Sequence, residues 1–146
     1  MNRTSRLSHL ALLAFALLGI SACNRTKVAQ CNRLIQTVNQ QEERLRPQMN
    51  QTSQSGDPTQ IDALAAAFER SGREINTVQL TDPQLQNLSR QYQGVIARFV
   101  TVSRGMAAAA RAQNADAIQQ AMPQLTQIEN DSNAVTDRIN QYCGAQ

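Results

Sequence analysis

Aromatic residues and histidine are scarce in this chain. Its 146 residues include no tryptophan, three phenylalanines, two tyrosines and one histidine, His9. Histidine is the usual general base and metal ligand at neutral pH, and few aromatic rings are left to stack on nucleic-acid bases. The sequence also lacks a haem-attachment motif, a glycine-rich phosphate loop and a nucleophile elbow. We therefore expect a protein that is not an enzyme, holds no metal or cofactor and binds no nucleic acid.

Two pairs of nearby carboxylates are the remaining candidates for acid–base or cation chemistry. Glu42 and Glu43 lie in one predicted helix, and Glu129 and Asp131 lie in another. Adjacent acids on a helix point to different faces, and exposed faces commonly carry them. We expect these four side chains to be solvated surface groups.

Basic charge is spread along the chain rather than concentrated on one face. The 14 basic and 11 acidic side chains become 12 and 11 if the N-terminal segment with Arg3 and Arg6 is removed. Arg25, Lys27 and Arg33 form the only basic cluster. These three side chains could contact anionic lipid headgroups, or they could belong to a solvated tether.

The first two dozen residues have the layout of an export signal. Arg3 and Arg6 precede an uninterrupted apolar stretch, residues 10–20, and small residues follow. This order is that of a secretory signal peptide. The apolar stretch is about half the length that a membrane-spanning helix needs, so cleavage is favoured over an uncleaved anchor.

The residues Ile20, Ser21, Ala22 and Cys23 resemble the lipobox of bacterial lipoproteins, with Ile in place of the usual Leu. The resemblance implies cleavage between Ala22 and Cys23 and a diacylglyceryl group on Cys23. Two acyl chains give persistent membrane attachment, with the polypeptide outside the cytoplasm at the periplasmic face or the outer cell surface. The alternative is an ordinary cleavage site followed by a structural cysteine.

Cysteine parity agrees with lipidation. A lipid on Cys23 leaves an even pair, Cys31 and Cys143, in a compartment that favours oxidation. We predict a disulfide between Cys31 and Cys143, and the alternative is two reduced thiols.

The rest of the chain has helical periodicity and no alternating pattern typical of a strand. Asp57 and Asp82 each precede a proline at the first helical position, Gln60 completes a capping-box pattern with Asp57, and Asn114 provides a softer start signal. The predicted helices are residues 27–50, 58–79, 83–112 and 115–142.

Short connections between these helices predict an all-α, antiparallel up-down-up-down four-helix bundle, although the heptad spacing is also compatible with a long coiled coil. With an even number of antiparallel helices, Cys31 and Cys143 lie at the same end. The predicted organisation is a signal peptide at 1–22, a lipidated tether at 23–30, the bundle at 31–143 and a tail at 144–146.

Polar residues interrupt the apolar seams, the lines of residues spaced three and four apart that face the core. Gln41, Ser71 and Ser132 occupy such positions. We favour mutual hydrogen bonds that set the register; the alternative is that they line a small internal cavity. Pro47 and Pro123 fall inside helices and should bend or split them.

The segments "QCNRLI", beginning at Gln30, and "INQYC", ending at Cys143, resemble small helical lipoproteins of cyanobacterial type. The resemblance implies an exported helical bundle with no catalytic role. We expect a membrane-anchored binding or scaffolding module whose partner is a protein of the cell envelope. The alternative function is a carrier of a small apolar ligand held between the helices.

Overall fold

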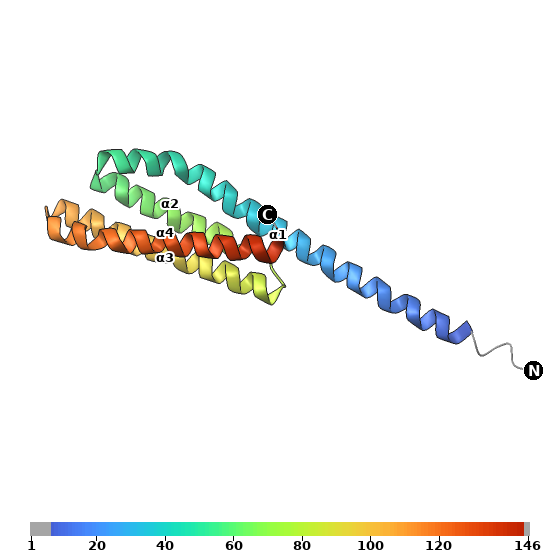
Figure 1. Ribbon diagram of the computed structural model, residues 1–146. Coiled ribbons are helices and arrows are strands. Elements are labelled where there is room, and N and C mark those ends of the chain that lie inside the picture. Colours follow the sequence, from blue (N-terminus) through green and yellow to red (C-terminus); the bar gives the residue numbers. More distant parts are fainter. Residues whose placement is uncertain (1–6, 145–146) are drawn as a thin grey trace, which may run out of the picture.

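The computed structural model describes residues 7–144, with side chains from Thr26 onward. These residues form four helices and no strand: α1 (Leu7–Ser55), α2 (Pro58–Asn76), α3 (Pro83–Arg111) and α4 (Ala115–Cys143). Each helix runs antiparallel to the one before it, and the end of α4 lies beside α1 (Figure 1). The prediction of an all-α four-helix bundle is confirmed.

The helix starts are fixed by the predicted capping residues. Asp57, Asp82 and Asn114 precede α2, α3 and α4, and their side chains satisfy backbone N–H groups that the helix leaves without a partner. The donors are the N–H groups of Thr59, Leu85 and Ala117, at 2.7, 2.9 and 3.0 Å.

The capping box predicted at Asp57 differs from the prediction in one respect. The side chain of Gln60 does not reach the Asp57 N–H; instead that N–H donates to the Ser55 hydroxyl oxygen at 3.2 Å, and the Ser55 hydroxyl donates to Gln60 Oε1 at 2.8 Å. Ser55 is the last residue of α1, so the relay closes the turn between α1 and α2.

Three helix boundaries differ from the sequence prediction by three residues or more. One is the end of α1, which lies at Ser55 rather than at residue 50. Helix α1 begins at Leu7 rather than at residue 27, because the segment before the bundle contains no proline from Leu7 onward and only one glycine, Gly19. Helix α2 ends at Asn76 rather than at residue 79. The Thr77 hydroxyl donates to the backbone oxygen of Glu74 at 2.7 Å and caps the last turn.

The core lies where the apolar seams of the four helices meet. Burying one large aliphatic side chain contributes about 1.5–3 kcal/mol. The largest fully buried side chains are Leu34, Ile75, Leu85 and Leu88. Gly72 allows α2 and α3 to approach closely, since a Cβ there would lie 3.3 Å from Ile96 Cγ2.

The disulfide between Cys31 and Cys143 closes one end of the bundle and confirms the predicted pairing. Their Cα atoms are 5.6 Å apart, and Cys31 is 3% exposed. The bridge joins α1 to α4, the two helices that an even helix count brings together at this end.

Polar contacts reinforce this closed end. Gln30 Oε1 accepts the backbone N–H groups of Thr81 and Asp82, at 2.5 and 3.0 Å. The Lys27 ammonium group lies 3.8 Å from the centroid of the Tyr142 ring, and the Tyr142 hydroxyl donates to Asp82 Oδ2 at 2.9 Å. Residues 26–30, assigned to a tether from the sequence, are helical here, and two of them pack on the bundle.

These contacts also bear on the predicted basic cluster. Lys27 packs on an aromatic ring, and Arg33 Nη2 donates to the backbone oxygen of Gln79 at 3.3 Å. Two of the three basic side chains therefore make contacts within the bundle. The side chain of Arg25 lies outside the described part of the chain.

Neither internal proline splits its helix. Pro47 lies inside α1 and Pro123 inside α4, and both helices continue past them. In Figure 1 the part of α1 that lies along the bundle is curved, as expected for a helix that lacks a backbone donor at an interior position.

Candidate functional site: a cavity bordered by all four helices

A cavity of about 500 Å³ is bordered by residues of all four helices. Its volume falls within the range of small-molecule pockets in proteins. Most of its lining is apolar: Leu45, Met49, Phe68, Tyr92, Val95, Ile96, Phe99, Leu125 and Ile128.

The cavity exists because α1 packs unevenly on its neighbours. Helix α3 packs closely on both α2 and α4, whereas α1 packs less extensively on α2 and only sparsely on α4 (Figure 1). The seam of α1 carries two polar residues, Gln41 and Gln48, whereas the seams of α2 and α4 carry one each, Ser71 and Ser132. Helix α1 therefore has less apolar area whose burial could stabilise its packing on α4.

Aromatic side chains line the inner part of the cavity. The rings of Phe68 and Phe99 have their centroids 4.1 Å apart at an interplanar angle of 43°. The buried Tyr92 donates its hydroxyl to Glu42 Oε1 at 3.2 Å. Burial, and then the neighbouring Glu42 carboxylate, raise the pKa of the Tyr92 phenol. Tyr92 therefore stays neutral throughout the physiological pH range.

The predicted polar seam residues all border this cavity. Gln41, Ser71 and Ser132 are among its lining side chains, and within the described chain no hydrogen bond joins them to one another. The favoured expectation of mutual hydrogen bonds is therefore wrong. The three residues do line a shared cavity, but this cavity is partly open to solvent rather than internal. The reason is that α1 and α4 lie too loosely together here for the three side chains to meet.

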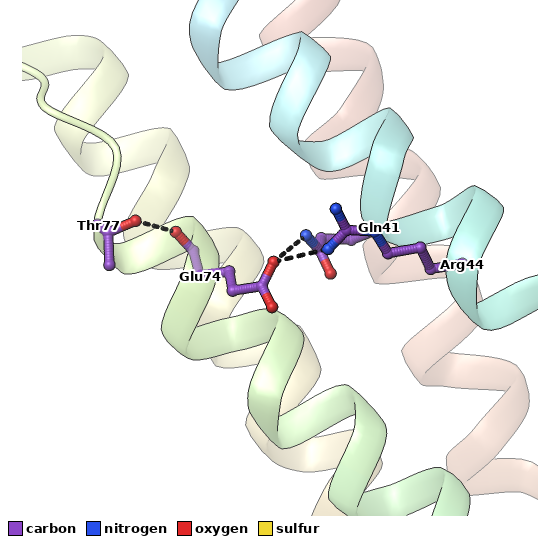
Figure 2. Close-up of polar contacts among 4 residues, drawn as sticks. All are labelled: Gln41, Arg44, Glu74 and Thr77. Carbon is purple, nitrogen blue, oxygen red and sulfur yellow. Dashed lines mark hydrogen bonds and ion pairs between the residues drawn. The ribbon is translucent and has the colours of Figure 1, made fainter.

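Gln41 finds its partner on α2 instead. Figure 2 shows the Glu74 carboxylate facing two side chains of α1: Glu74 Oε2 accepts from Gln41 Nε2 at 2.5 Å and from Arg44 Nη1 at 3.0 Å. The side chains of Arg44 and Glu74 are 63% and 51% exposed, so their ion pair contributes roughly 1 kcal/mol or less. The cluster ties α1 to α2 and holds Gln41 at the cavity wall.

The two carboxylate pairs separate in the structure. Glu42 and Glu129 border the cavity from α1 and α4, with exposed side chains, whereas Glu43 does not line it. Asp131 pairs with Arg98 Nη1 at 2.7 Å and accepts from Gln127 Nε2 at 2.8 Å. Hydrogen bonds from Gln127 and Arg98 lower the pKa of Asp131. Neither predicted pair forms a two-carboxylate site.

In the part of the chain with described side chains, no three histidine, cysteine, aspartate or glutamate residues gather closely enough to hold a metal ion. The same part contains no helix with the length and apolar character needed to cross a bilayer. The predicted cleavage site at Ala22 and the predicted lipidation site at Cys23 lie outside the residues whose side chains are described.

The aromatic residues of the cavity, Phe68, Tyr92 and Phe99, were not among the site residues expected from the sequence. The sequence does contain one indication of the cavity: the seam of the first helix has few apolar residues, which predicts that this helix packs loosely on its neighbours. Comparison with protein families, with curated proteins and with solved structures finds no match to this chain.

Proposed function

We propose that this protein is a membrane-anchored extracytoplasmic lipoprotein that binds a small apolar molecule in the cavity between its helices. The observation that carries the proposal is the cavity of about 500 Å³, lined mainly by aliphatic and aromatic side chains. Each CH₂ group that leaves water for such a lining contributes about 0.8 kcal/mol. Several buried carbons would therefore offset part of the cost of association.

The charge distribution supports binding at this position. Arg46 and the carboxylates of Glu42 and Glu129 lie at the exposed border of the cavity, whereas its inner wall carries Phe68 and Phe99. A border of this kind keeps the opening hydrated and leaves the interior for apolar groups.

The proposed lipid on Cys23 would hold the cavity near the membrane surface. A bilayer is the reservoir of apolar molecules in a cell, and an anchored bundle would exchange ligands with its surface. The cavity begins at Gln41, ten residues beyond Cys31, or about 15 Å along α1. The disulfide agrees with an oxidising compartment.

A scaffolding role with an envelope protein stays a prediction. Few large apolar side chains with a described position are exposed: Val28, Met49 and Met122. Of these, only Met49 borders the cavity. The exposed surface thus supports a protein-docking role less specifically than the cavity supports ligand binding.

Native mass spectrometry of the lipidated chain, released from nanodiscs made of its own membrane lipids, tests the proposal. The wild-type protein should retain a bound small molecule. Ser132→Trp places a large side chain in the cavity and should abolish that retention, whereas Asn130→Trp, on an exposed position of the same helix, should preserve it. Equal occupancy in both variants, or no bound molecule in any form, contradicts the proposal.

A further inference from the structure

Ser71 is the least exposed polar side chain at the cavity wall. The residue is 3% exposed and lies on α2, between Phe68 and Ile75 in the apolar seam. Within the described chain its hydroxyl has no hydrogen-bond partner. A leucine at this position would fill part of the cavity, so the serine both leaves room and supplies a polar atom.

Among the described residues, Thr52 Oγ1 is the only fully buried side-chain oxygen without a partner, so the Ser71 hydroxyl is still accessible from the cavity. A ligand that filled the cavity without bonding to this hydroxyl would leave it unpaired, which is unfavourable. Ser71 can donate one hydrogen bond and accept others. Ser132 also lines the cavity, from the opposite side on α4, and likewise has no partner among the described residues. The cavity therefore combines an apolar lining with hydroxyl groups that are available to a ligand.

The surroundings of Ser71 also favour a ligand without a net charge. The charged residues that border the cavity, Glu42, Arg46 and Glu129, are all exposed. No charged side chain of the lining is buried near Ser71 to neutralise an ion, and transferring an unpaired charge into an apolar site is strongly unfavourable. Burial also raises the pKa of Tyr92, which is consistent with a poorly hydrated interior.

We propose that the ligand is an uncharged apolar molecule carrying one hydroxyl or carbonyl oxygen, and that this oxygen forms a hydrogen bond with the Ser71 side chain. The inference rests on the proposed function and narrows its ligand class. Purely hydrocarbon molecules bind more weakly because they leave the Ser71 hydroxyl without a partner. Anionic and cationic molecules of the same shape are rejected.

Four naphthalene derivatives of the same ring size test this inference. Naphthalene has no polar group, 2-naphthol has a neutral hydroxyl, 2-naphthoate is an anion and 2-naphthylmethylammonium is a cation. Their ring fluorescence is titrated against the full lipidated chain in nanodiscs, with the signal of empty discs subtracted. The chain has no tryptophan, and excitation on the long-wavelength side of tyrosine absorption avoids emission from its two tyrosines.

We expect 2-naphthol to bind about two- to tenfold more tightly than naphthalene, as one neutral hydrogen bond allows, and more than tenfold more tightly than either ion. Ser71→Ala should remove the preference for 2-naphthol over naphthalene, and Ser71→Thr, which restores a hydroxyl, should recover it. Ser103→Ala is the matched control, because Ser103 is a buried serine outside the cavity lining. It should leave the preference unchanged.

The possible failures are distinguishable. If naphthalene binds but 2-naphthol binds no more tightly, or if Ser71→Ala retains the preference, the role of Ser71 is wrong while the proposed function stands. If either ion binds as tightly as 2-naphthol, the assignment of an uncharged ligand is wrong. If neither neutral ring binds, the proposed function and this inference both fail.

Discussion

Removing the disulfide should cost the bundle a large part of its stability. The bridge joins residues separated by 112 positions. In the chain-entropy description, closing a loop of this length contributes about 5 kcal/mol by restricting the unfolded chain. Domains of this size are commonly stable by 5–15 kcal/mol. The double variant Cys31→Ala, Cys143→Ala should therefore keep its helices but unfold at a much lower denaturant concentration.

The structure adds a prediction about where the weakened protein opens. Helix α1 contacts α4 sparsely, so the bridge is the main connection between them at the closed end. Without it, the amide hydrogens of α1 near Cys31 should exchange with solvent faster, while those in the middle of α3 should change less. The loss of protection should thus be localised before the whole bundle unfolds.

Pulse proteolysis in urea measures this stability for protein held in liposomes. A reductant should bring the wild-type chain to the midpoint of the double variant, and the same reductant should leave the double variant unchanged. A decrease of less than about 1 kcal/mol in the free energy of unfolding would refute the reasoning, because the loop-closure contribution expected from the sequence separation is several times larger.

Two further predictions concern individual side chains. The hydrogen bond from the Leu85 N–H has the largest effect on the pKa of Asp82; burial opposes it, and the hydrogen bond from the Tyr142 hydroxyl adds to it, so that the pKa lies below its usual 3.8. The stability from the charged form of Asp82 is therefore present above about pH 4 and is lost as the pH falls through the lowered pKa. Asp82→Asn keeps a side chain that can cap the helix but cannot ionise. In this variant the free energy of unfolding should decrease less as the pH falls through this range. The same decrease as in the wild-type protein would contradict the stabilising role of the charged Asp82. Thr52 Oγ1 is buried without a hydrogen-bond partner among the described residues, so Thr52→Val, nearly the same in shape, should raise the unfolding free energy by about 1 kcal/mol. Urea unfolding that shows a clear loss of stability in Thr52→Val would indicate that the hydroxyl does have a partner.

The architecture was accessible from the sequence because its signals are local. Asp57 and Asp82 start helices whichever way the helices later pack, and the even number of helices places Cys31 and Cys143 together. The ends of helices were less predictable: α2 stops at Asn76 because a threonine hydroxyl, and not a glycine or proline, caps its last turn.

The cavity could be predicted only in part, because it depends on distances between helices. The positions of Gln41, Ser71 and Ser132 in the seams predicted that they would face the interior. Whether they meet or remain apart depends on how closely α1 approaches α4, which no local pattern specifies. The partner of Gln41 is Glu74 on an exposed part of α2, and the periodicity of either helix contains no sign of that pairing.

Intact-mass spectrometry of the protein extracted from its native membrane tests the central claim most directly. The claim is that an exported, lipid-anchored bundle closed by its own disulfide presents the cavity outside the cytoplasm. The account predicts a chain that begins at Cys23, carries acyl groups on that residue and gains the mass of two hydrogens on reduction. A chain that retains residues 1–22, or that begins at Cys23 without acyl groups, would contradict it.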